Sequence, residues 1–203
     1  MLLLLAKKYA DRLKNTPKYA DGFKPAICKA ELNKKFKDKF VFAVDMGDLF
    51  GNWVPSNWIQ QVVDAVKQSP DSNFLFLTKN PERYYEFIET LPSNVVLGAT
   101  IETNRTYPVS NAPTNKERYC LMANLPWNNK LISIEPIMDF DIEILVSAIK
   151  AISPAIVYVG YDNYNNNLPE PPLAKTKMLI QELEKFTRVR TKTLREPEVN
   201  QND

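Results

Sequence analysis

NFLFLTKNPERYYEFIETLPSNVVLGATIE, residues 73–102, contains a complete strand–helix–strand unit. Two apolar runs in it, Phe74–Leu77 and Val95–Ile101, are typical of strands that are buried on both faces. Between them, apolar residues recur at helical spacing, and Asn80 followed by Pro81 is a helix start signal. Two strands that are joined through a helix favour a right-handed crossover, so this unit predicts a parallel sheet.

The same alternation continues through the rest of the chain, where further apolar runs predict strands and helical spacing predicts amphipathic helices. These runs are Phe40–Val44, Leu131–Ile134 and Ile156–Val159, and a last strand over Arg188–Leu194 completes the predicted fold. The other predicted helices contain Trp58, Val62 and Val66, then Ile142, Leu145 and Ile149, then Ala174–Phe186. The sequence therefore predicts an α/β fold whose parallel sheet is an open doubly wound sheet or a full or partial barrel.

The length of 203 residues predicts a single domain, because it suffices for one substantial core and is short for two. Residues 1–39 form a helical N-terminal segment in this interpretation, with a helix over Leu2–Lys14 and a basic connection over Lys24–Lys39. Residues 40–195 carry the strand–helix repeats. Residues 196–203 are expected to be a flexible tail.

Composition excludes several classes of function. There is no histidine, which removes Ser-His and Cys-His catalysis and the histidine zinc motifs. Cys28 and Cys120 lie too far apart in sequence for a short-spaced metal motif, and the five glycines fit neither a P-loop nor a dinucleotide fingerprint.

The balance of charge and hydropathy points to a water-soluble protein. With 26 basic and 24 acidic residues, the net charge of +2 gives no global field for nucleic acid or an anionic membrane. The apolar run Met1–Ala6 is far shorter than a membrane-spanning helix. We therefore expect a cytoplasmic protein with no membrane partner.

Polar side chains follow the predicted strands, and in parallel α/β folds ligands bind at the carboxyl ends of the strands. The candidate ligand-binding residues are Asp45, Asp48, Thr78, Lys79, Asn80, Glu102, Asn104, Glu135 and Asp162. Carboxylates that share one rim repel one another unless a cation or a basic side chain neutralises them, and Lys79 is the candidate partner. The rim therefore predicts a pocket for a cationic or hydroxyl-bearing ligand, or for a magnesium-type ion.

Several of these acids have a purely structural alternative. Carboxylates are common helix N-caps in strand-to-helix turns, which need no ligand. Glu135 directly follows an apolar strand and precedes Pro136, so it is either a site residue or a buried carboxylate that anchors the next loop through backbone amides. Tyr161 and Tyr164, beside Asp162, are candidates for stacking on a ligand.

The last predicted strand carries Arg188, Arg190 and Lys192 at alternate positions, which places them on one face. Lys192 completes the candidate ligand-binding set. Such a face suits a phosphate or carboxylate of a small molecule, or a nucleic-acid backbone. The alternative is that these charges protect an edge strand from unwanted pairing.

The rim motifs together resemble a known family. They are Asp45-Met46-Gly47-Asp48-Leu49-Phe50, Leu77-Thr78-Lys79-Asn80-Pro81-Glu82-Arg83, Ser133-Ile134-Glu135-Pro136 and Val159-Gly160. In this order and spacing they are similar to the phage-related radical-SAM-like proteins of poorly defined function. The resemblance implies a partial (β/α) barrel of radical-SAM type, in which three cysteines after the first strand hold a four-iron cluster beside S-adenosylmethionine.

This chain departs from that family in its cluster motif. Leu4 stands where the last cysteine is expected, and the first strand is missing, so no iron–sulfur cluster is expected in this chain. The family also tends to have glycine and glutamate where Tyr161 and Asp162 stand. The resemblance then leaves a truncated or a cluster-free form that acts by binding at the rim, and S-adenosylmethionine remains a possible ligand.

Two other functions stay open. One is a magnesium- or manganese-dependent enzyme that uses Asp45, Asp48, Glu102 and Glu135 as oxygen ligands. The other is a virus- or mobile-element-encoded protein that binds nucleic acid or another protein through its basic last strand. A homodimer is a further expectation, because the missing first strand leaves a sheet edge to cover.

Overall fold

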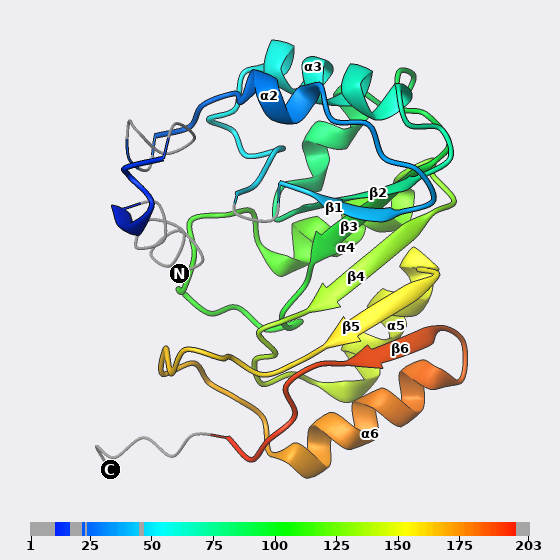
Figure 1. The fold of residues 1–203 in the computed structure, drawn as a ribbon. Helices are drawn as coiled ribbons and strands as arrows, with labels where there is room; N and C mark the ends of the chain where they lie inside the picture. Colours follow the sequence, from blue (N-terminus) through cyan, green and yellow to red (C-terminus); the bar gives the residue numbers. More distant parts are fainter. Residues whose placement is uncertain (1–10, 17–21, 23, 45–46, 198–203) are drawn as a thin grey trace.

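The computed structural model describes residues 11–16, 22, 24–44 and 47–197 (Figure 1). Its strands are β1 (Phe40–Ala43), β2 (Asn73–Thr78), β3 (Val95–Thr100), β4 (Lys130–Ile134), β5 (Ile156–Val159) and β6 (Arg188–Thr191). Its helices are α2 (Lys29–Leu32), α3 (Ser56–Lys67), the 3-10 helix η2 (Pro81–Glu86), α4 (Asn115–Asn124), α5 (Ile142–Ile152) and α6 (Leu173–Glu184).

The strands form one six-stranded sheet in the order β1-β2-β3-β4-β5-β6, and every neighbouring pair is parallel. The sheet curls into a half-barrel, with α3 over one end, α6 over the other and α4 and α5 behind it (Figure 1). The predicted α/β partial barrel is confirmed. The sheet leaves β1 and β6 as its edges.

The hydrophobic core lies between the helices and the convex face of the sheet. Alternate residues of the strands, such as Phe76, Ala99, Ile132 and Val157, point into this layer and join one buried cluster with residues of the helices. Phe50, in the loop between β1 and α3, is fully buried and packs edge-on against Tyr84, with 4.6 Å between the ring centroids. Burial of these large side chains is what holds the helices on one side.

The intervening residues of each strand point to the opposite, concave face, because successive side chains of a strand alternate. Residues that are paired across a parallel sheet lie side by side. One row on the concave face is Leu77, Gly98, Leu131, Ile156 and Arg188, and the next toward the strand ends is Thr100, Ser133, Tyr158 and Arg190. Leu75 and Leu131 are buried but lie outside the main core cluster, as expected for this face.

Three local differences from the sequence prediction have physical causes. The segment after Asn80 is a 3-10 helix that ends at Glu86, and the Asn80 side chain makes no cap hydrogen bond. Instead the Asn80 amide donates to the Phe50 carbonyl (3.0 Å) and to Asn52 Oδ1 (2.7 Å). Helix α4, which the sequence reading did not predict, begins at a capping box between Thr114 and Glu117.

Much of both predicted end segments lies outside the described residues. The predicted helix over Leu2–Lys14 falls mostly outside the described residues, with Asp11 and Arg12 helical in the described part. The basic connection over Lys24–Lys39 contains the short helix α2. Most of the predicted tail, residues 198–203, also lies outside the described residues.

Candidate functional site

The carboxyl ends of the central and last strands bring Lys79, Glu102, Glu135 and Lys192 to the rim of the concave face. Glu102, Glu135 and Lys192 each lie two residues beyond the row of Thr100, Ser133 and Arg190, so they continue the same side of the sheet. We call these residues the charged mouth. It contains two carboxylates and two ammonium groups, joined as two ion pairs.

Glu102 is the buried member of the charged mouth. Its side chain is 4% exposed and is held by Lys79 through one oxygen and by Arg118 Nη1, at 2.7 Å, through the other. Arg118 comes from α4, is itself 3% exposed and also donates to the carbonyl oxygens of Thr100 and Pro113. A buried carboxylate that has two cationic partners is fixed in place, so Glu102 positions the Lys79 ammonium group at the mouth.

Glu135 is the accessible carboxylate. Its Oε2 lies 2.8 Å from Lys192 Nζ, and the side chains of the pair are 18% and 52% exposed. The Lys192 ammonium group also lies 5.4 Å from the centre of the Tyr158 ring. Because Lys192 reaches water, this pair opens at little cost and Glu135 is then free to accept a hydrogen bond from a ligand.

The floor beside the charged mouth is made of small residues. Thr100 and Ser133 are paired in register on β3 and β4, and Gly160 lies just after β5, two residues beyond Tyr158, the register partner of Ser133. A Cβ atom at Gly160 would come within 3.4 Å of Glu135 Oε1 and 3.2 Å of Lys192 Cβ. A side chain at position 160 would therefore crowd both members of the accessible pair.

Several predicted rim residues hold loops. Asp48 Oδ1 accepts from the Phe50 amide (3.0 Å) and the Thr78 hydroxyl (2.6 Å), and its Oδ2 accepts from the Lys79 amide (2.9 Å). Asp48 and Thr78 therefore tie the loop after β1 to the end of β2. Asn80, described above, supports the same loop. Asp45 lies outside the described residues.

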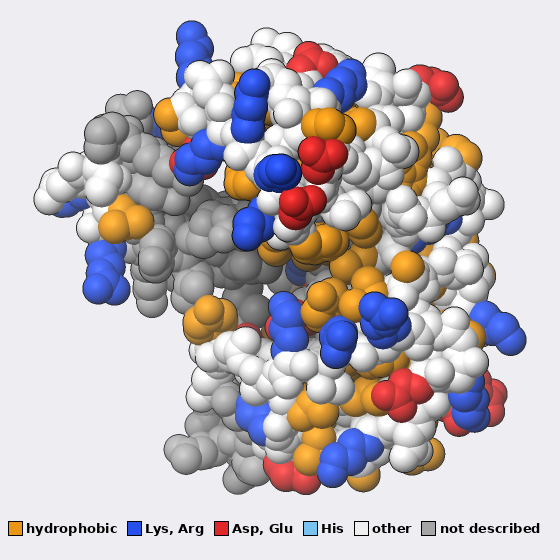
Figure 2. Space-filling model, turned by 45° about the vertical axis from the view of Figure 1, so that its right-hand side comes forward, with side chains coloured by type: hydrophobic (Ala, Val, Ile, Leu, Met, Phe, Trp, Pro, Cys, Tyr) orange, Lys and Arg blue, Asp and Glu red, His pale blue; other side chains and the backbone are white. Residues whose placement is uncertain are grey.

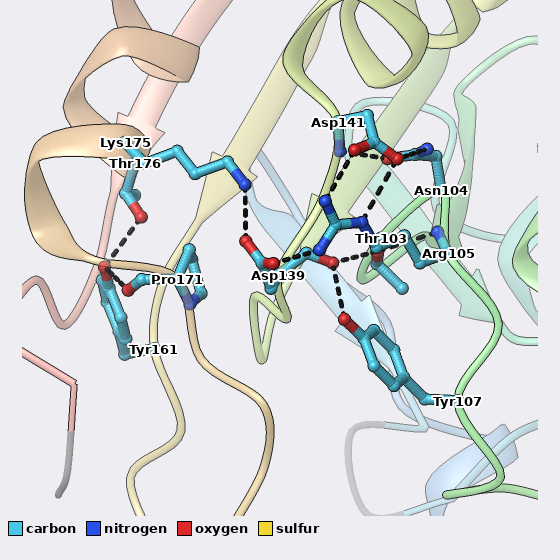
Figure 3. A network of polar contacts seen from close by, with 10 residues as sticks. All are labelled: Thr103, Asn104, Arg105, Tyr107, Asp139, Asp141, Tyr161, Pro171, Lys175 and Thr176. Atoms are coloured by element: carbon cyan, nitrogen blue, oxygen red, sulfur yellow. Dashed lines mark hydrogen bonds and ion pairs between the residues drawn. The ribbon is translucent and has the colours of Figure 1, made fainter.

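The loops after β3 and β4 are joined by a separate polar network (Figure 3). Asn104 exchanges hydrogen bonds with the Asp141 carboxylate and amide, and the Arg105 guanidinium pairs with both Asp139 and Asp141. Lys175, in the first turn of α6, binds the other oxygen of Asp139 at 2.6 Å. Asn104 is therefore a loop-holding residue, and the sequence reading missed Arg105, Asp139 and Lys175.

The charges of this network lower the pKa values of its acids. Hydrogen bonds from Arg105 and Asn104 lower the pKa of Asp141 from its ordinary value of 3.8 to about 2. Burial by itself raises the pKa of Asp139, but the hydrogen bond and the charge of Lys175 outweigh burial, and the pKa is lowered overall. Both acids therefore stay ionised in neutral solution, as the ion pairs require.

The loop after β5 is also held by local contacts. Asp162 is buried and accepts hydrogen bonds from the Tyr164 and Asn166 amides at 3.3 and 2.8 Å. The interpretation of Tyr161 as a stacking residue was wrong, because its ring is fully buried and its hydroxyl donates to the Pro171 carbonyl at 2.8 Å. Burial raises the pKa of Tyr161. Tyr164 is 57% exposed, in the same loop.

The acidic and cysteine side chains are the ones that could act as metal ligands. Within the described ranges, no cluster of three or more His, Cys, Asp or Glu side chains could hold a metal ion. The chain has two cysteines, Cys28 before α2 and the exposed Cys120 in α4. A three-cysteine cluster site cannot be assembled from them, so the residues of this chain do not fit a four-iron cluster of the radical-SAM type.

The length and hydropathy of a helix determine whether it could cross a membrane. In the part of the chain that the structure describes, no helix combines the length and the apolar character needed to cross a bilayer.

The fold and the charged mouth define the class of protein: a parallel α/β half-barrel with a polar site at the carboxyl ends of its strands. Residues 5–158 match the family described as "Protein of unknown function (DUF5131)". This match covers more than half of the chain, and the protein belongs to that family. No curated protein and no solved structure matches the chain.

Proposed function

We propose that the protein is a ligand-binding half-barrel related to the radical-SAM-like proteins, and that its charged mouth binds S-adenosylmethionine or a similar zwitterion. The observation that carries the proposal is the accessible pair of Glu135 and Lys192 beside the fixed pair of Lys79 and Glu102. A zwitterionic ligand offers a positive and a negative group, and the mouth offers a partner for each.

The chemistry of the ligand matches the accessible members of the mouth. S-adenosylmethionine has an ammonium group and a sulfonium group, both of which suit the carboxylate of Glu135, and a carboxylate that suits Lys79 or Lys192. The neighbouring Thr100 and Ser133 hydroxyls supply neutral hydrogen-bonding groups on the floor. The ligand then replaces an exposed ion pair, which costs little.

The proposal is for binding and not for radical chemistry. Reductive cleavage of S-adenosylmethionine in radical enzymes needs an electron from a thiolate-bound cluster, and this chain lacks the three-cysteine motif. Phage relationship and radical-SAM ancestry rest on the rim motifs alone. A cluster-free form that keeps the pocket fits both the motifs and the chemistry of the mouth.

The organic ligand is favoured over a magnesium or manganese site. Asp48 already accepts three hydrogen bonds, and Glu102 already has two cationic partners. Divalent cations instead require several carboxylate or carbonyl oxygens that converge on one point. Three of the acids proposed as metal ligands lie in the described residues: Asp48, Glu102 and Glu135. Of these three, Glu135 alone is able to change partners.

The test is a thermal-shift titration of the whole protein with S-adenosylmethionine, with magnesium chloride in parallel. At a ligand concentration about 100 times Kd, we expect a saturable rise in Tm on the order of 5 °C. Glu135→Gln should remove most of this rise, because the neutral amide does not attract the ammonium group. Gly160→Leu should also remove it by filling the space beside Glu135.

The matched control is Glu143→Gln, which removes an exposed carboxylate in the first turn of α5. This variant should keep the full rise in Tm. A rise with magnesium and none with S-adenosylmethionine would reject the proposal in favour of the metal-dependent alternative. An equal loss in both glutamine variants would show that the ligand responds to net charge and not to the mouth.

A further inference from the structure

Arg188 and Arg190 on β6 are two exposed cations that make no ion pair with the described residues. Both are exposed, and both lie on the concave face beside Ile156 and Tyr158. Within the described residues, neither arginine has an ion pair or a side-chain hydrogen bond, whereas Lys192, further along the same face, is paired with Glu135. Two neighbouring unpaired guanidinium groups repel each other, and a bound anion would relieve this repulsion.

The opposite edge of the half-barrel exposes aromatic rings on the same face. Phe42 pairs in register with Leu75, a concave-face residue, and Phe40 lies two positions earlier on β1. Their side chains are 44% and 59% exposed, which is unusual for phenylalanine in a sheet. The segment that leads into β1 is basic, with exposed Lys34, Lys35, Lys37 and Lys39.

These features meet across one hollowed surface. Figure 2 shows hydrophobic side chains gathered across the recessed middle of the view, with Lys and Arg side chains on both sides of it. Between the edges lie Leu77, Leu131, Ile156 and the Tyr158 ring. The concave face therefore combines an apolar and aromatic floor with basic flanks.

We infer that this concave face binds single-stranded nucleic acid, with the phosphates of one segment along β6 and the bases of another segment at the exposed rings of β1, on the opposite edge of the sheet. Alternate residues of a strand are ~6.6 Å apart, which is comparable with the spacing of successive phosphates in an extended single strand. Arg188 and Arg190 thus meet neighbouring phosphates, to which guanidinium groups bind strongly. Exposed rings beside a basic groove are how sequence-tolerant single-strand binders hold unstacked bases.

The occupant is a single strand and not a duplex. A duplex keeps its bases stacked and offers no π-face to Phe40 or Phe42, so the exposed rings would gain nothing from it. The inference uses none of the residues of the charged mouth, and it stands or falls independently of S-adenosylmethionine binding.

The test is fluorescence anisotropy with a labelled 15-nucleotide oligo-dT, an oligo-rU of the same length and a labelled duplex, at several salt concentrations. We expect the single strands to bind more tightly than the duplex. Arg188→Gln/Arg190→Gln should weaken binding about fivefold or more and make the slope of log K against log salt shallower by about 1.4, or ~0.7 per phosphate. Phe42→Ala should weaken binding by about fivefold or more without changing that slope.

Two controls keep the result specific. Lys150→Gln/Lys177→Gln removes the same charge from exposed positions on α5 and α6, and it should leave binding unchanged. Arg188→Lys/Arg190→Lys keeps the charge and should keep most of the affinity, which also shows that β6 folds when it is substituted.

Three outcomes would overturn the inference. The first is no anisotropy change up to about 100 µM protein at low salt, where non-specific binding is normally measurable. The second is an equal loss of affinity in the Lys150/Lys177 control. The third is aggregation of the Arg188→Gln/Arg190→Gln variant with unchanged affinity, which would show that the arginines serve to protect the sheet edge.

Discussion

Glu102 is a buried charge at the rim. This carboxylate is almost completely removed from water, and it is tolerable there because Lys79 and Arg118 neutralise it from two sides. The arrangement has a mechanical effect at the mouth. The Lys79 ammonium group is held at a fixed position, while Glu135 and Lys192, which are more exposed, are able to rearrange around a ligand.

Removal of Arg118 should therefore be costly. In Arg118→Met the buried carboxylate of Glu102 keeps Lys79 but loses its other partner, and the Thr100 carbonyl loses its donor. We expect the free energy of unfolding to fall by about 3 kcal/mol, measured by urea denaturation. Lys67→Met breaks an exposed ion pair with Asp64 and should cost less than about 1 kcal/mol. Similar losses in the two variants would contradict the buried-pair account.

Loops after successive strands are the elements that shape the rim. The loop after β3 and the loop after β4 are joined through Arg105, Asp139 and Asp141, and Lys175 links both to α6 (Figure 3). Charged contacts between loops replace the hydrogen-bond ladder that holds the strands themselves. The rim should for this reason respond to acid before the sheet does.

The pKa of Asp141 gives that response a direction. Since the folded-state pKa of about 2 lies below the ordinary 3.8, ionised Asp141 stabilises the folded protein above pH 3.8, and this contribution disappears as the pH falls toward 2. We expect Asp141→Asn to have a lower Tm than the wild type at pH 6. Between pH 4 and pH 2, the Tm of this variant should fall by less than the Tm of the wild type. If Tm, measured by circular dichroism, falls equally in the two proteins between pH 4 and pH 2, Arg105 does not stabilise this carboxylate.

The sequence predicted the strands well and the helices unevenly, for physical reasons. Strands that are buried on both faces leave continuous apolar runs, which are hard to miss. Helix α4 buries Arg118 and Met122 and little else along its length, so it has almost no apolar stripe to detect. Its signal was the capping box of Thr114 and Glu117, which marks a start without a hydrophobic pattern.

The site was predictable as a location but not as a set of contacts. The rule that parallel strands end at one rim selects Lys79, Glu102 and Glu135 from the sequence. Which of the rim acids accept ligands and which hold loops depends on partners such as Arg118, which lies in the unpredicted helix. Those partners come together through strand register and loop geometry, which a single sequence does not determine.

At the scale of the whole molecule, the two faces of the half-barrel have different roles. The convex face packs the helices and supplies the core, and the concave face carries polar, small and exposed aromatic residues that such a core does not need. Among the described strands, β1 and β6 are not paired with each other, so the sheet stays open between them. This division is why both proposed ligands fall on the same face.

The most direct test of ligand binding at the mouth is methyl NMR of the protein, labelled at Ile and Leu, during titration with S-adenosylmethionine. Leu77, Leu131 and Ile156 lie on the concave face, and Leu179 and Leu183 lie on the buried side of α6, in the convex core. We predict saturable shift changes in the concave-face methyl groups and little change in those of α6. No change in any methyl group, or changes confined to α6, would contradict the central claim.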